Sequence, residues 1–277
     1  MQLSEIYIYP IKSLAGIQLK QSNVTLRGLE NDRRFMLTTL DGTFLTQRNI
    51  PQMALLQTKI TDDQLLVYPK NRPSDNISIP LKPDRFYGTQ KTNVWNTDCE
   101  GKILDKATNQ WFSKRLDTSC QLIYMTDDHQ RAIEQPFGQE GEIVSFADGF
   151  PFLLLGKSSM DDLNQRLKHP VSVNRFRANL VFSGGKAFEE DNWKYFKIGR
   201  LTFRVAKPCA RCQVPNINQE TGLAETEPNR TLAGYRRIYK NKITFGMNVC
   251  WEKEKSEGIE RLRTGDEVRE LMIREIT

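Results

Sequence analysis

The sequence predicts a mainly β protein of the α+β class, in which a small β-barrel-like unit precedes a second, larger β unit. The first 95 residues hold many short runs of alternating apolar and polar side chains, separated by turns rich in Asp, Asn and Pro. Such a pattern is typical of barrels. Further along, two segments show helical spacing, so helices are expected at the periphery only. We place the two domains at residues 1–95 and 96–277.

The first strand is expected over residues 3–9, where apolar and polar side chains alternate until Pro10. A turn at residues 11–16 then presents Lys12 and Ser13. Residues 35–39 and 43–46 flank Asp41-Gly42, a dipeptide that favours a tight hairpin. Further strands of this unit are expected at residues 53–60, 64–68, 76–81 and 92–95.

Two helices are expected, near residues 103–116 and 157–168. In the first, Trp111, Phe112 and Leu116 lie on one side. In the second, Ser158 precedes Asp161 by three residues, which is a capping-box arrangement with Asp in place of Glu.

The segment 174–179 carries Arg175 and Arg177 just before the apolar strand 180–182. If this segment is extended, the two arginines share a face and form a candidate anion clamp, because guanidinium groups bind phosphate oxygens in pairs. A pair of surface arginines explains the pattern equally well.

A strand expected over residues 200–206 leads into Lys207-Pro-Cys-Ala-Arg-Cys212. Pro208 should end it, so that Cys209 and Cys212 lie in a turn beyond the sheet edge. A cation next to a cysteine favours the thiolate, which binds metals. Four interpretations remain open at this point: half of a zinc site, a redox pair, buried packing, or one thiolate ligand to a cofactor metal beside an anion-binding Arg211.

Composition and charge limit the kinds of ligand or partner that this protein can bind, but they do not identify one. The 277 residues carry a net charge of +6, which suits an anionic ligand, a nucleic acid or an acidic partner. The densest basic cluster lies at residues 234–242, and a solvated loop is the simpler interpretation of it. No apolar run has the length of a membrane span, and the N-terminus lacks a signal-peptide pattern. Five cysteines without a secretion signal favour a cytoplasmic protein with reduced thiols.

Taken together, the motifs resemble the family of proteins that join an N-terminal β-barrel domain to a MOSC domain. The resemblance is close to the bacterial N-hydroxylaminopurine-detoxifying members and the mitochondrial amidoxime-reducing component. The motifs occur in the family's order along nearly the whole chain, at residues 9–13, 32–35, 145–151, 175–179, 190–193, 207–212, 245–246 and 263–268.

This resemblance implies a molybdenum cofactor, in which molybdenum is bound by molybdopterin. By position in the motifs, Cys212 would be the metal ligand and Cys209 a packing residue. The resemblance also assigns the binding of the pterin and its phosphate to six residues: Lys12, Ser13, Arg34, Arg177, Asn179 and Arg211. Asp148 is a candidate proton donor, because the family places its loop near the cofactor.

The implied activity is reduction of N-hydroxylated compounds (hydroxylaminopurines, amidoximes, hydroxylamines) to amines. The chain has no C-x₄-C-x₂-C ferredoxin signature, so the expectation is either an external donor of the ferredoxin or flavoprotein type or a fused electron-transfer domain outside this sequence. No membrane or nucleic-acid partner is expected. The alternative is a non-catalytic module that binds or carries the cofactor or activated sulfur, since MOSC domains also occur attached to cofactor sulfurases.

Overall fold

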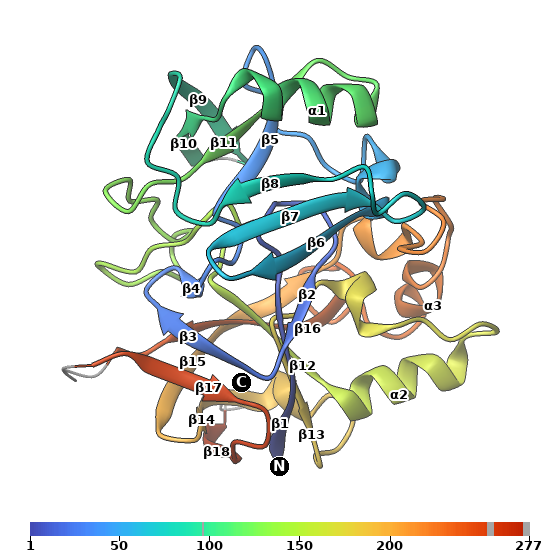
Figure 1. The fold of residues 1–277 in the computed structure, drawn as a ribbon. Coiled ribbons are helices and arrows are strands. Elements are labelled where there is room, and N and C mark those ends of the chain that lie inside the picture. The colour runs from blue at the N-terminus through green and yellow to red at the C-terminus, as the bar shows by residue number, and fades with distance from the viewer. Residues whose placement is uncertain (96, 254–257, 274–277) are drawn as a thin grey trace.

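The computed structural model describes residues 1–95, 97–253 and 258–273. Its fold is mainly β, as predicted, with four sheets and few helices (Figure 1). The strands are β1 (Gln2–Ile8), β2 (Ile17–Leu19), β3 (Gln21–Thr25), β4 (Gly28–Leu29), β5 (Phe35–Thr39), β6 (Leu56–Thr61), β7 (Gln64–Pro69), β8 (Ile77–Pro80), β9 (Thr89–Val94), β10 (Thr97–Ile103), β11 (Cys120–Tyr124), β12 (Phe152–Gly156), β13 (Leu180–Ser183), β14 (Trp193–Ile198), β15 (Leu201–Ala210), β16 (Thr244–Trp251), β17 (Glu260–Arg263) and β18 (Val268–Ile273).

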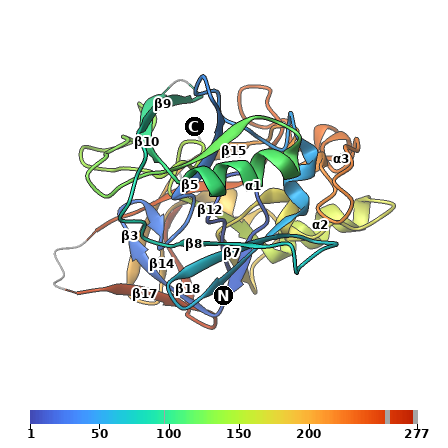
Figure 2. The same ribbon diagram turned by 45° about the horizontal axis from the view of Figure 1, so that its top comes forward.

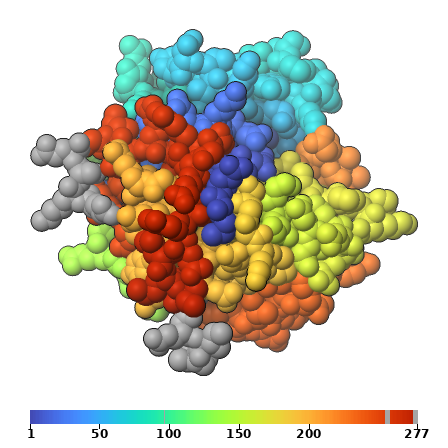
Figure 3. Space-filling view, turned by 90° about the horizontal axis from the view of Figure 1, so that it is seen from below, coloured from blue at the N-terminus to red at the C-terminus, as the bar shows by residue number. Residues whose placement is uncertain are grey.

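The largest sheet has eight strands in the order β18-β14-β15-β16-β12-β13-β1-β2. The strands β1 and β2 of this sheet come from the start of the chain, and β1 pairs antiparallel with β13. In the view from below, the blue N-terminal end lies between the red C-terminal segment and a yellow segment (Figure 3). Residue pairing agrees, because Gln2 lies opposite both Ser183 and Glu267. The N-terminus is therefore built into the sheet that carries the cysteine motif.

Three smaller sheets complete the fold, in the orders β5-β11-β10-β9, β17-β3-β4 and β6-β7-β8. The first joins residues 35–39 to residues 97–124, and the second joins the start of the chain to residues 260–263. Strand pairing thus crosses the expected boundary at residue 95 repeatedly, as the expected close packing of the two halves requires. The boundary itself stays a prediction.

The α-helices of the described residues lie at the periphery: α1 (Lys106–Leu116), α2 (Lys157–Arg166) and α3 (Asn229–Ala233). The first packs on β11 and β8 and the second on β12 and β13. In Figure 2, α2 and α3 lie on the other side of the molecule from β9 and β10. The two expected helices are confirmed. Four 3₁₀ segments occur at η1 (Pro51–Leu55), η2 (Val173–Phe176), η3 (Glu189–Asn192) and η4 (Val214–Asn216).

Local chemistry explains the helix starts, in one case against expectation. Asp105 caps α1 by accepting a hydrogen bond from the Thr108 amide at 2.9 Å. The predicted cap of α2 is wrong. The N-cap is Gly156, and the Ser158 hydroxyl instead donates to the Gly185 carbonyl at 2.6 Å.

Two further local predictions are corrected. Residues 173–176 form a 3₁₀ turn, and Arg177 has a left-handed backbone with φ of 56°, so Arg175 and Arg177 do not share a strand face. Pro208 does not end its strand, because β15 continues to Ala210. The ladder with β16 shifts register on both sides of Pro208, and bulges are where a strand tolerates proline.

Candidate functional site

A cavity of about 120 Å³ lies where the N-terminal segments meet the large sheet. Every predicted site residue except Arg34 lines it. The complete lining is Lys12, Ser13, Arg33, Thr46, Arg48, Ala147, Asp148, Gly149, Phe150, Phe152, Leu153, Phe176, Arg177, Asn179, Cys209, Arg211, Cys212, Val214 and Asn248.

Lys12 and Ser13 lie in the turn after β1. The Lys12 ammonium donates to the Phe146 carbonyl at 2.7 Å and to Asp148 Oδ1 at 2.5 Å. Burial lowers the pKa of Lys12, and Asp148 only partly opposes this shift. Ser13 has a φ of 70°, which is uncommon for a residue other than glycine and is a feature of functional turns. The turn therefore presents one cation and one hydroxyl at a constrained position.

Asp148 lies in the loop between residues 145 and 151, which Arg131 braces from inside. The Arg131 guanidinium donates to the carbonyls of Ser145, Ala147 and Asp148 at 2.6 to 2.8 Å. Burial tends to raise the pKa of Asp148, but the charge and hydrogen bond of Lys12 outweigh it and lower that pKa. Asp148 is therefore a carboxylate at neutral pH, and the 63% exposure of its side chain also favours the charged form.

The same loop lies against the N-terminal unit at Gly28. A Cβ atom at this position would lie 2.5 Å from the Pro151 carbonyl oxygen, and φ at Gly28 is 118°. Glycine is therefore required there for the loop to approach β4 so closely.

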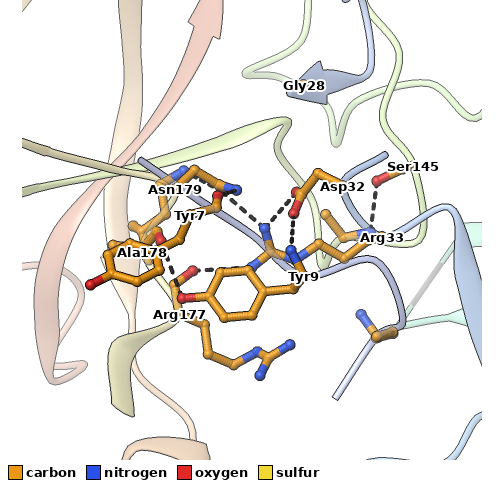
Figure 4. A network of polar contacts seen from close by, with 12 residues as sticks. Tyr7, Tyr9, Gly28, Asp32, Arg33, Ser145, Arg177, Ala178 and Asn179 are labelled. Atoms are coloured by element: carbon orange, nitrogen blue, oxygen red, sulfur yellow. Dashed lines mark hydrogen bonds and ion pairs between the residues drawn. The ribbon is translucent and has the colours of Figure 1, made fainter. Parts of the chain in front are cut away.

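Arg33 is the centre of a buried network (Figure 4). Its Nη1 donates to Asp32 Oδ2 at 2.5 Å and to Asn179 Oδ1 at 3.0 Å, and its Nη2 donates to the Arg177 carbonyl at 3.0 Å. The guanidinium carbon lies 4.3 Å from the centre of the Tyr9 ring. Arg33 thus joins the N-terminal segment to residues 177–179.

Arg34 is turned away from this cavity. Its guanidinium donates to the Met125 carbonyl and, at 2.7 Å, to Asp127 Oδ1. It lines a different depression of the surface. The predicted role of Arg34 at the cofactor therefore has no support from its position, and Arg33 is the arginine of the motif that reaches the cavity.

Arg177 and Asn179 enter from the segment before β13. Arg177 Nη1 donates to the Leu14 carbonyl at 2.7 Å, and its guanidinium stacks 4.1 Å from the centre of the Tyr9 ring. Its Nη2 is buried and has no hydrogen-bond partner in the described structure. Burial, followed by the charge of Arg33, lowers the pKa of Arg177 to about 10, so it remains a cation at neutral pH.

The Asn179 side chain is occupied by protein groups. Its Oδ1 accepts from Arg33 and from the Leu153 amide at 3.2 Å, and its Nδ2 donates to the Tyr7 carbonyl at 3.1 Å. It therefore holds the surrounding segments in place.

The cysteine motif forms the end of β15 and the turn after it. Arg211 Nη1 lies 3.0 Å from Cys209 Sγ, and its Nη2 donates to the Phe176 carbonyl at 2.9 Å. Arg211 Nε is buried without a partner in the described structure. Burial raises the pKa of the Cys209 thiol, and Arg211 opposes this shift without cancelling it. Cys209 therefore stays a thiol at neutral pH despite the cation beside it.

A zinc site finds no ligand set here. Within residues 1–95, 97–253 and 258–273, no group of three or more His, Cys, Asp and Glu side chains is placed to hold a metal ion. Structural zinc needs four such ligands. A metal at this turn would have to bring its other ligands with it, as a cofactor does.

The cavity suits an anionic group. Five cationic side chains line it (Lys12, Arg33, Arg48, Arg177 and Arg211), and Asp148 is the one acidic side chain in the lining. A buried donor without a partner is costly, yet Arg177 Nη2 and Arg211 Nε are both in that state. A phosphate would satisfy them, and Cys212 offers a soft sulfur ligand beside them.

Three arginines of this site were missed from the sequence. Arg33 lay inside a recognised motif, one residue from the predicted Arg34. Arg131 belongs to a segment whose composition predicts a polar loop, and Arg48 follows a predicted hairpin. Neither residue lies in a sequence motif that would identify it as part of a binding site. Their roles depend on contacts over long distances in the chain.

Comparison with known proteins defines the family. Residues 1–119 match the MOSC N-terminal beta barrel domain, and residues 141–269 match the MOSC domain. The chain belongs to the family of proteins that carry these two domains in this order.

Two kinds of relative are similar to this chain. A molybdenum cofactor sulfurase of Solanum lycopersicum is 33% identical over 96% of this chain, but the matched region is only 35% of the sulfurase. The chain thus spans about a third of that relative's length. Mitochondrial amidoxime reducing component 2 of Bos taurus is 29% identical over 98% of this chain and 83% of its own length. Among solved structures, the YUAD protein from Bacillus subtilis aligns over 96% of this chain and 93% of its own, with 10% identity and a TM-score of 0.43.

Both groups of relatives are named for molybdenum-cofactor or amidoxime chemistry, which supports a function related to the molybdenum cofactor. No described helix has the length and apolar character needed to cross a membrane.

Proposed function

We propose that this protein is a molybdenum-cofactor-dependent reductase that converts N-hydroxylated compounds to amines. The observation that carries the proposal is the pair of buried, unpartnered donors, Arg177 Nη2 and Arg211 Nε, in one cavity with Cys212. An anionic cofactor that brings its own metal fits these three groups together. The similarity to amidoxime-reducing components along most of both chains points to the reductase.

In this proposal, Arg177, Arg211, Lys12 and Ser13 hold the pterin and its phosphate, because their side chains line the cavity. Arg33 takes the part expected of Arg34. Asn179 acts indirectly by fixing Arg33 and the backbone at Leu153. Arginine suits this task because its planar fork of donors matches phosphate oxygens.

Cys212 is the proposed metal ligand, through its thiolate. When bound, the molybdenum centre supplies the two electrons that reductive cleavage of an N–O bond needs. The overall conversion consumes these two electrons and two protons, and it releases one amine and one water.

One of the two protons must come from a side chain of the cavity lining, and the other from solvent. The ionised state of Asp148 does not suit a proton donor, so we assign the first proton to Lys12 Nζ. Burial lowers the pKa of Lys12, which makes its ammonium a stronger acid than a solvent-exposed lysine. Asp148 Oδ1 holds this ammonium in place at 2.5 Å.

The first test is molybdenum content. Protein purified from a host that makes the cofactor should contain near-stoichiometric molybdenum by elemental mass spectrometry. Cys212→Ala should lose it, whereas Cys250→Ala, at a buried cysteine outside the cavity lining, should keep it. Full molybdenum in Cys212→Ala would refute the ligand assignment, and its absence from all three folded proteins would refute the cofactor.

The second test is turnover. The loaded protein should reduce an amidoxime and a hydroxylamine with an artificial electron donor, and then with a ferredoxin- or flavoprotein-type reductase. Loaded protein that reduces neither substrate would argue against the reductase.

The similarity to molybdenum cofactor sulfurases favours one alternative, a non-catalytic module that binds or carries the cofactor or sulfur. A carrier should transfer its cofactor to an apo-enzyme within the time of the assay. A reductase should retain it through turnover, so molybdenum measured in both proteins after mixing and separation distinguishes the two.

A further inference from the structure

An exposed tryptophan in an unusual backbone conformation lies against Arg48, a residue of the cavity lining. Trp95 follows the last residue of β9, where Val94 pairs with Thr97 to close the hairpin with β10. Its φ is 59°, and the residue is 48% exposed. A bulky residue rarely adopts this conformation, and glycine or asparagine would serve such a tip at lower cost. The turn alone therefore does not explain tryptophan at this position.

Arg48 holds one face of the indole. Its guanidinium carbon lies 4.3 Å from the centre of the Trp95 ring and 5.8 Å from that of Phe44. Its Nε donates to Thr46 Oγ1 at 3.3 Å, which fixes the plane of the group. Arg48 also lines the cavity. A stacked cation orients the ring and covers one face, while Trp95 as a residue remains 48% exposed.

Trp95 also lies near the proposed proton-transfer pair. Its side chain contributes to the lowered pKa of Asp148, and Asp148 in turn binds Lys12. The indole therefore contacts Arg48 through its face and lies near Asp148, and both of these residues line the cavity.

We propose that Trp95, held by Arg48, is a stacking platform that selects planar conjugated N-hydroxylated substrates over small aliphatic hydroxylamines. This inference rests on the proposed reductase and names its substrate class. A flat amidoxime or N-hydroxylated heteroaromatic ring offers a π-face to the free side of the indole, and an aliphatic hydroxylamine does not. Stacking of a base on an aromatic side chain contributes roughly 1–3 kcal/mol.

Two substitutions separate the ring face from the indole N–H. Trp95→Asn removes the aromatic surface but keeps an N–H donor, and asparagine tolerates the left-handed backbone. Trp95→Phe keeps an aromatic face and removes the donor. Tyr87→Ala is the matched control, because Tyr87 is also an exposed aromatic of the N-terminal region but, in the described structure, does not stack on a cation of the cavity lining as Trp95 does on Arg48.

The readout is binding by calorimetry to the cofactor-loaded protein without an electron donor, using benzamidoxime and N-methylhydroxylamine as probes. The wild type should bind benzamidoxime more tightly. Trp95→Asn should weaken that binding about ten-fold, which corresponds to roughly 1.4 kcal/mol, and leave N-methylhydroxylamine unchanged. Trp95→Phe and Tyr87→Ala should bind benzamidoxime as the wild type does. With turnover, the loss should appear in KM rather than kcat.

Three results would overturn the inference: equal binding of both probes by the wild type, unchanged benzamidoxime binding by Trp95→Asn, or an equal loss in Trp95→Phe. The last would assign the effect to the indole N–H. Failure of the reductase itself would appear separately, as absence of turnover with either probe despite normal binding.

Discussion

Arg175 and Arg177 lie two residues apart in the chain, yet their guanidinium groups end in different cavities. Arg177 lines the small cavity with the cysteines, where five cations face a single carboxylate. Arg175 lines a larger one of about 680 Å³ beside the end of α2, which it shares with Glu220, Glu225 and Glu227. Arg175 Nη2 binds Glu225 at 2.5 Å.

The contrast shows what distinguishes an anion site from a structural ion pair. Both arginines are largely buried, and in the described structure Arg175 leaves two donor atoms and Arg177 one without a partner. Only Arg175 has a carboxylate at hydrogen-bond distance, which balances its charge within the protein. The larger cavity is thus electrostatically satisfied and the smaller one is not. Charge balance, rather than cavity size, marks the site.

The largest effect is expected from Arg177→Met. Removing one partner of a buried, hydrogen-bonded charge pair typically costs about 2 kcal/mol or more, or roughly 30-fold in affinity. Molybdenum content and retention of cofactor during dialysis should therefore fall sharply. Arg175→Met, the same change two residues earlier, should leave both unchanged. Equal losses in the two variants would remove the distinction between the cavities.

The next largest effect is expected from Glu225→Gln. This substitution removes the negative charge that pairs with Arg175 in the larger cavity. Arg175 is 5% exposed, so losing its carboxylate partner leaves a poorly solvated cation. Because the Glu225 side chain is 41% exposed, solvent reduces the cost to about 1–2 kcal/mol in free energy of unfolding. Urea denaturation would measure it, and molybdenum content should not change.

Glu220→Gln is the matched control in the same cavity. Glu220 pairs with Lys70, and both side chains are exposed, so an effect near zero is expected. A loss as large as that of Glu225→Gln would show that burial of Arg175 is not the cause.

A smaller effect is expected at Arg34, whose guanidinium binds Met125 and Asp127 away from the cysteine cavity. Arg34→Met should change the free energy of unfolding by at most about 1 kcal/mol and should keep the cofactor. Arg33→Met should lose it, because Arg33 holds Asn179 and the Arg177 carbonyl. If Arg34→Met instead loses molybdenum, the sequence-based assignment of Arg34 is restored.

Arg33 and Arg34 also show which features of the fold and the site can be predicted from the sequence alone. The mainly β fold, the helices over 106–116 and 157–166 and the gathering of Lys12, Asp148 and Cys212 follow from local patterns and motifs. Neither pattern nor motif tells which of two adjacent arginines turns inward, because that depends on partners such as Asn179, 146 residues away. The φ of 56° at Arg177 likewise follows from packing and not from propensity.

The smallest effect on stability is expected at Glu190. This residue extends the comparison of the two arginines to a buried acidic group. This fully buried carboxyl accepts hydrogen bonds from neutral donors, the Gly156 amide at 3.0 Å and the Ser159 hydroxyl at 2.9 Å. Burial raises the pKa of Glu190 above its ordinary value of 4.5. A raised pKa means that its favourable contribution is complete at acidic pH and is lost as pH rises through the folded-state pKa.

Glu190→Gln stays neutral at every pH, so its stability relative to the wild type should increase from pH 5 to pH 8. Urea midpoints of both proteins at the two pH values measure this difference, with Glu189→Gln as the positional control. A difference that shrinks as pH rises would mean that Glu190 is stabilised as a carboxylate. Buried charge in this fold would then be tolerated without a counter-ion, and the unpartnered donors of Arg177 and Arg211 would no longer imply an anionic ligand.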